Sequence, residues 1–156
     1  MLLAQALAER AAAQDRLLKV TERITAAARI QEGDEKVEDT AQLLAEAEQL
    51  IAQIEQLVRQ INLTNSFTEL DPGVTLTDAL ARRDALLQAS RFYTKVADAA
   101  ASRHDRYSAS EIRFVSTIDI AAVRKKADQA SQQYRELDTR IQQANWMTSL
   151  LELAAN

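Results

Sequence analysis

Among the side chains that could take part in catalysis, the one histidine of the sequence, His104, is the strongest candidate. It belongs to the run Ser102–Asp105, which contains a serine, a histidine and an aspartate, the residue types of a hydrolase triad. Neighbouring residues on a helix point in different directions, whereas a triad needs three side chains that converge. We therefore expect His104 to lie exposed at a helix end. The sequence predicts a protein that is not an enzyme and has no catalytic residue.

The usual ligands of metals and cofactors are scarce in this sequence. It has no cysteine, and a di-iron bundle site would need two Glu-x-x-His repeats, whereas the residue three positions before His104 is Ala101. Gly33 and Gly73 stand alone, outside any glycine-rich phosphate-binding pattern. The sequence predicts no metal and no cofactor, although a magnesium or calcium site made of carboxylates alone is left open.

Charge and hydropathy restrict the partners of the protein. With 19 basic and 23 acidic residues the net charge is -4. The short basic clusters at 82–83 and 124–126 fit solvated helix faces better than a phosphate-binding surface. No apolar stretch reaches the ~18 residues that span a bilayer, and the first residues lack the basic region that opens a signal peptide. We therefore expect a cytoplasmic protein that does not bind nucleic acid.

Apolar residues recur every three or four positions over four long stretches, a pattern typical of amphipathic helices. The sequence has only two glycines and one proline, which argues against sheet-rich folds. Asp39 and Thr75 have the residue types and positions of helix caps. We predict an all-α fold in a single domain, residues 1–156: an elongated, antiparallel, coiled-coil-like four-helix bundle. Its helices are predicted at 2–27, 40–62, 76–105 and 119–147, before a C-terminal tail at 148–156.

A minor two-stranded β element is predicted between residues 29–32 and 112–115. Alternating apolar residues give the second segment weak strand character, and the up-down topology brings both segments to one end of the bundle. Pro72-Gly73 predicts a tight turn in the connection at 65–74. That connection lies at the other end of the bundle, and we do not expect it to pair within the chain.

Arg10 and Arg83 interrupt the apolar stripes of the first and third predicted helices. A buried guanidinium group must be paired or it is costly, and Asp84 and Asp138 are candidate partners. We predict a polar core layer formed by Arg10, Arg83 and Asp138 that sets the register of the helices. The alternative is that each long side chain reaches water.

The helices carry more apolar surface than a thin bundle can hide. Leu44, Ile51 and Val58 widen the stripe of the second predicted helix, and the third is apolar on two sides. After residue 145 the pattern changes and gives the tail an apolar face of its own. We predict a homo-oligomer with an interface made by Phe92, Val96, Trp146, Leu150 and Leu153. The tail could instead enter a membrane surface, but it lacks the cationic face typical of interfacial helices.

Five blocks of the sequence occur in a characteristic order, namely Ile61–Asn65, Thr75–Asp84, Asp105–Ser108, Tyr134–Gln142 and Asn145-Trp146. In this order they resemble the septicolysin-like family of small bacterial proteins over nearly the whole chain. The resemblance implies an α-helical bacterial protein and carries over no catalytic or ligand-binding residue. The family label also implies an alternative function, a membrane-active protein of cytolysin type.

The leading hypothesis from the sequence is a non-enzymatic helical protein that assembles with itself and serves as a structural or protein-interaction module. The membrane-active protein is the alternative, and only under this alternative would a membrane be a partner.

Overall fold

The computed structural model describes residues 1–102 and 113–153 of the chain, and most of them are helical. The described part contains four helices and one two-stranded antiparallel sheet, which confirms the predicted all-α class with a minor β element. The elements are α1 (Leu3–Ala27), α2 (Thr40–Phe67), β1 (Glu69–Asp71), β2 (Val74–Thr75), α3 (Leu76–Ala101) and α4 (Ile120–Met147).

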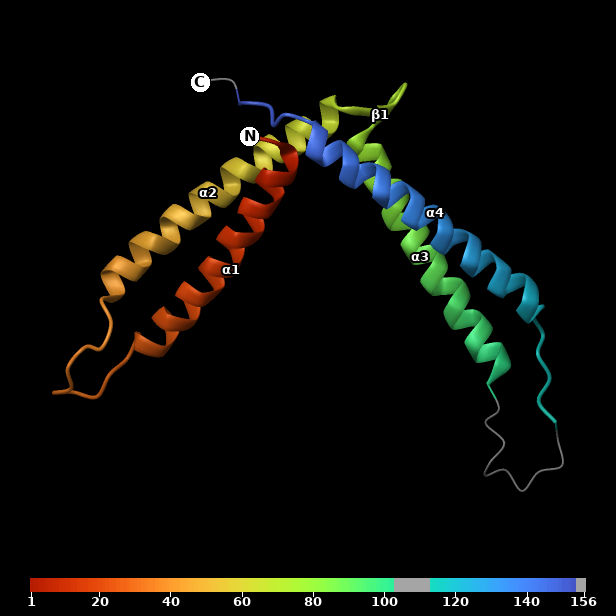
Figure 1. Ribbon diagram of the computed structural model, residues 1–156. Helices are drawn as coiled ribbons and strands as arrows, with labels where there is room; N and C mark the ends of the chain where they lie inside the picture. The colour runs from red at the N-terminus through yellow and green to blue at the C-terminus, as the bar shows by residue number, and fades with distance from the viewer. Residues whose placement is uncertain (103–112, 154–156) are drawn as a thin grey trace. The chain divides into compact units, whose positions relative to one another are not determined.

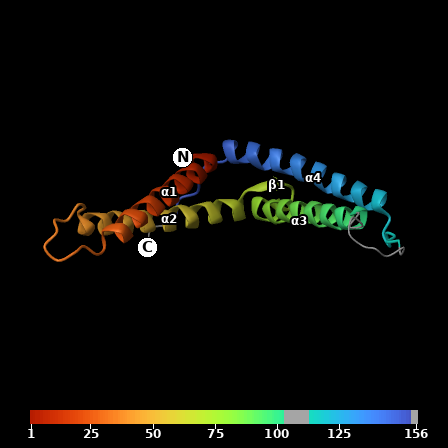
Figure 2. The same cartoon turned by 90° about the horizontal axis from the view of Figure 1, so that it is seen from below.

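The chain consists of two compact units, each with its own internal packing. The first unit comprises Met1–Glu69 and Gln143–Asn156, and the second comprises Leu70–Gln142. In the first unit α1 and α2 run side by side, as Figures 1 and 2 show from two directions, and in the second unit α3 lies beside α4 (Figure 1). The single domain predicted over residues 1–156 stays a prediction.

Apolar residues that recur every three or four positions on α1 pack against those on α2, so the two helices form an antiparallel hairpin. Its core contains buried side chains from both helices, with partly buried ones packed around them. These core residues are Ala13, Leu17, Val20, Ile24, Leu43, Ala47, Leu50 and Ile54. At the start of α2, Asp39 accepts hydrogen bonds from the backbone N–H groups of Ala41 and Gln42, both at 3.1 Å. Asp39 therefore caps the helix, as its residue type predicts.

The first residues of the chain meet the segment that follows α4 at one end of the first unit. The backbone N–H of Leu3 donates a hydrogen bond to the carbonyl oxygen of Thr148 at 2.9 Å. The backbone N–H of Leu150 donates to the carbonyl oxygen of Met1, also at 2.9 Å. The backbone N–H of Leu151 donates to the hydroxyl of Thr64, also at 2.9 Å. The segment that follows α4 is thereby fastened to both α1 and α2.

The predicted end of α2 at residue 62 is wrong, because the helix continues to Phe67. Thr64 explains the difference. Its hydroxyl donates to the carbonyl of Gln60 at 2.7 Å and accepts from Leu151, so this polar side chain is satisfied although it is fully buried. Polar residues that usually mark a helix end are therefore tolerated here within the helix.

The second unit is an antiparallel pair formed by α3 and α4, as predicted for consecutive helices. Thr75 caps α3 in a capping box with Asp78. The predicted end of α3 at residue 105 is wrong, because α3 ends at Ala101 and Ser102 already has an extended backbone. Ala97 is the last buried residue of α3. The small alanines that follow it bury little area, so tertiary packing no longer supports the helix.

The β element lies elsewhere than the sequence indicated. Residues 29–32 and 113–115 form no strand, and residue 112 lies outside the described residues. The ribbon instead pairs β1 with β2 across Pro72-Gly73, where Gly73 has a φ of 76°. A proline followed by a glycine with positive φ is the signature of a type II turn. This turn closes the ribbon locally, at a much smaller entropic cost than pairing two segments about 80 residues apart.

Candidate functional site

The structure brings together two of the three residues of the predicted polar layer. The Nη1 atom of Arg83 lies 3.3 Å from Oδ1 of Asp138, and its Nη2 atom lies 2.9 Å from Oδ1 of Asp84. Burial lowers the pKa of the Arg83 guanidinium, but the hydrogen bonds and charges of Asp84 and Asp138 outweigh this effect and raise the pKa overall. Arg83 therefore stays charged and links α3 to α4.

Arg10, the third residue of the predicted layer, belongs to α1 in the first unit. Its Nε atom is buried, and the described residues offer this atom no hydrogen-bond partner. Arg10 thus differs from Arg83, whose guanidinium is held by two carboxylates.

A further polar contact between α3 and α4 was not predicted. The hydroxyls of Ser90 and Ser131 share a hydrogen bond of 2.6 Å in a half-buried position. The position of Ser90 in the apolar stripe of α3 was the only signal in the sequence, and it did not identify the partner.

One side of the α1–α2 hairpin is apolar and uncovered. Leu18 on α1 and Leu44 and Ile51 on α2 are 58%, 52% and 55% exposed. Helical periodicity places them, with half-buried Leu7 and Val58, on the side opposite the Arg16–Glu46 ion pair. We call these five residues the Leu44 face. Leu18 was missed from the sequence because it lies off the main stripe of α1.

The α3–α4 hairpin has an apolar side as well. Phe92 is exposed, and its ring meets that of Tyr93 edge to face at 5.3 Å between centroids. Half-buried Val96 and the neighbouring alanines Ala85 and Ala89 share this side of α3. We call Ala85, Ala89, Phe92 and Val96 the Phe92 face.

The other predicted interface residues belong to the first unit. Trp146 is exposed at the end of α4, and Leu150 and Leu153 are half-buried in the segment that follows. Exposed Phe67 and Met147 lie at the ends of α2 and α4 in the same unit. The predicted interface residues are therefore divided between two units, and their role in an oligomer stays a prediction.

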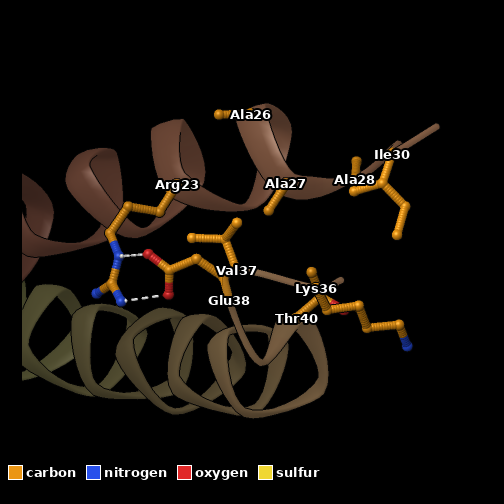
Figure 3. A pocket seen from close by; sticks show the side chains of 9 residues that line it. All are labelled: Arg23, Ala26, Ala27, Ala28, Ile30, Lys36, Val37, Glu38 and Thr40. Atoms are coloured by element: carbon orange, nitrogen blue, oxygen red, sulfur yellow. Dashed lines mark hydrogen bonds and ion pairs between the residues drawn. The ribbon is translucent and has the colours of Figure 1, made fainter. Parts of the chain in front are cut away.

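A cavity of about 460 Å³ opens where α1 and α2 are joined. Its lining consists of Arg23, Ala26, Ala27, Ala28, Ile30, Lys36, Val37, Glu38 and Thr40. Arg23 and Glu38 face each other across two hydrogen bonds of 2.7 and 3.0 Å, while the amine of Lys36 points away from them (Figure 3). The hydrogen bond from Arg23 lowers the pKa of Glu38, so both groups are charged and occupied with each other.

The remaining predictions about chemistry concern His104 and metals. His104 lies outside the described residues. Within the described ranges, 1–102 and 113–153, no group of three or more His, Cys, Asp and Glu residues could hold a metal ion. No helix in this part of the chain has the length and apolar character to cross a membrane.

Comparison with known proteins corrects the resemblance to the septicolysin-like family. Residues 10–150 match the model of "Family of unknown function (DUF6847)". A functionally unknown conserved protein from Corynebacterium diphtheriae has a similar crystal structure, with a TM-score of 0.92 and 48% sequence identity. That similarity covers 97% of this chain and 99% of the other. No curated protein matches the chain. The resemblance rested on short polar and apolar blocks that many amphipathic helices share, and the septicolysin-like assignment is wrong.

Proposed function

The chain belongs to the family of unknown function DUF6847, and we propose from its surfaces that it is a non-enzymatic helical module that works by assembling with itself. The observation that carries this proposal is that both helical hairpins leave an apolar face uncovered, the Leu44 face on one and the Phe92 face on the other. Large exposed apolar surfaces on a soluble protein typically mark interaction sites.

The aromatic residues support the same proposal. All three phenylalanines and the single tryptophan of the sequence are more than half exposed: Phe67 at 74%, Phe92 at 61%, Phe114 at 81% and Trp146 at 62%. In a compact monomer such side chains supply much of the core. At protein interfaces they are enriched and contribute much of the binding energy. Their placement here favours contact with another protein surface.

Sedimentation velocity over a micromolar concentration series tests this proposal. We expect dimers or larger species that dissociate on dilution. Replacing Leu44 and Ile51 with glutamate should shift the equilibrium toward monomer, while the same replacement of Gln49 and Gln53, on α2 outside the Leu44 face, should not. A wild-type chain that stays monomeric up to hundreds of micromolar would overturn the proposal.

The absence of an enzymatic role is a separate part of this proposal. It is supported by how the polar residues are used: Arg83 is held by two aspartates and Arg23 by Glu38. Hydrolysis of simple esters or phosphoesters that disappears in His104→Ala would contradict it. We also propose a cytoplasmic location. A chain without cysteine needs no disulfide, which is compatible with a reducing compartment, and cell fractionation tests this location.

A further inference from the structure

We propose that the Leu44 face of one chain packs on the Phe92 face of a second copy of the same chain. This inference rests on the self-assembly proposed above and names the two surfaces that meet. When the first unit of each chain packs on the second unit of the other, the two contacts form a closed dimer with two-fold symmetry.

The charges of the two units favour this pairing. The first unit holds seven basic and thirteen acidic residues, while the second holds twelve basic and ten acidic ones. The first unit thus has a net charge of -6 and the second a net charge of +2. Surfaces of opposite charge attract one another during association and exclude like-charged partners.

The same complementarity holds beside the two apolar faces. Glu48 and Glu55 each follow an exposed residue of the Leu44 face by four positions, so both carboxylates border it; Glu55 also lies 4.0 Å from Arg59 in an exposed ion pair on the same helix. Arg82 precedes the Phe92 face by three positions, and Lys95 follows Phe92 by three. Within the described part of the chain, neither Arg82 nor Lys95 has an ion-pair partner. These two cations are free to meet carboxylates of another chain.

The alternative pairing of like faces is disfavoured by the same groups. Two Leu44 faces in contact would bring Glu48 and Glu55 of one chain toward the same carboxylates of the other, and like charges held close together destabilise a contact. The shapes also differ. The Leu44 face has branched aliphatic side chains, whereas Ala85 and Ala89, which precede Phe92 on its face, leave room for such side chains to insert.

Two charge-reversed chains provide the test. One carries Glu48→Lys and Glu55→Lys, and the other carries Arg82→Glu and Lys95→Glu. Each variant alone places like charges at both contacts of its dimer, so we expect its dissociation constant to rise by about tenfold or more. An equimolar mixture restores opposite charges at both contacts, and we expect a heterodimer at least as tight as the wild-type dimer. Native mass spectrometry resolves the heterodimer from both homodimers.

Controls and outcomes separate this inference from the proposed function. Glu32→Lys with Glu35→Lys makes the same charge change in the turn between α1 and α2 and should leave the dimer unaffected, and circular dichroism should show that all variants remain helical. If the variants assemble like the wild type and show no preference in the mixture, the interface lies elsewhere. This inference then fails, while the proposed self-assembly stands. If both variants are monomeric and their mixture stays so, the two faces do not meet between chains and the inference is overturned. A monomeric wild type refutes the proposed function itself.

Discussion

At the scale of single residues, Arg83 is the side chain whose neighbours define its role most clearly. Its side chain is 24% exposed and that of Asp138 is 32% exposed, so the pair is only partly screened by water. Arg83→Met keeps the aliphatic stem but leaves Asp138 without this cation. We expect the free energy of unfolding to fall by about 1 kcal/mol, measured by urea denaturation.

The control for this prediction is Arg91→Met, an exposed arginine on the same helix, which should have little effect. A double-mutant cycle with Asp138→Asn isolates the contact between the two groups. Unchanged melting and unchanged oligomer size in Arg83→Met would show that Arg83 sets no register and simply reaches water.

For the replacement of Arg10 we expect no loss in the free energy of unfolding, in contrast to Arg83. Its buried Nε lacks a hydrogen-bond partner among the residues described, and such an atom is held at a cost. Arg10→Met retains most of the apolar stem while removing the unsatisfied polar group. We expect the variant to be as stable as the wild type or up to about 1 kcal/mol more stable, in urea denaturation. A clear loss of stability would mean that the guanidinium has a favourable interaction not accounted for by its Nε atom.

At the scale of elements, the cap of α3 predicts a dependence on pH. Hydrogen bonds from the side chain and backbone of Thr75 hold the pKa of Asp78 below its ordinary value of 3.8. The unfolded chain therefore binds this proton more readily than the folded chain does. The stabilisation is complete above that ordinary value and is lost as the pH falls through the lower pKa of the folded state.

The measurement is the melting temperature from about pH 5 down to about pH 2. In Asp78→Asn we expect a smaller loss of stability over this range than in the wild type, because the titrating group is gone. Asp128→Asn, an exposed position on α4, should follow the wild-type curve. Identical curves for wild type and Asp78→Asn would mean that the cap makes no difference to stability.

The helix starts were predictable from the sequence because their causes are local. Asp39 and Thr75 bond to backbone groups two or three residues away, and the helices that follow begin where these caps indicate. The end of α2 was not predictable, because it depends on a hydrogen bond between Leu151 and Thr64, 87 positions apart. The position of the β ribbon was predicted wrongly because the prediction relied on the topology of the helices, which favoured a distant pairing. The local turn at Pro72-Gly73 determines where the ribbon forms.

For the candidate site as well, the sequence predicted some features and missed others. The sequence identified Arg83 as an arginine in need of a carboxylate and included Asp138 among its partners, and the two do meet at 3.3 Å. It also placed Phe92 on a second apolar side of its helix. It did not identify Leu18, Phe67 or Met147 as exposed, because exposure depends on which neighbours cover a residue, and periodicity on one helix does not contain that information.

At the scale of the whole molecule, the uneven distribution of charge along the chain is hidden by the modest net charge of -4. The acidic excess belongs entirely to the first unit, and the second unit is slightly basic. A uniformly acidic protein would repel its own copies at every orientation. This division allows copies to attract one another in selected orientations, which is what a specific assembly needs.

Salt provides the test at this scale. Raising sodium chloride from about 50 mM to about 500 mM shortens the Debye length from roughly 14 Å to roughly 4 Å. Attraction between the acidic and basic units should then weaken, and we expect the dissociation constant of the wild-type dimer to rise by about tenfold. Burial of apolar area alone is not weakened by added salt, so a constant or lower dissociation constant would show that charge does not select the partner. The Arg82→Glu and Lys95→Glu chain, whose contacts repel, should associate more tightly as salt is added, and this reversal of sign makes the expectation specific to the two faces.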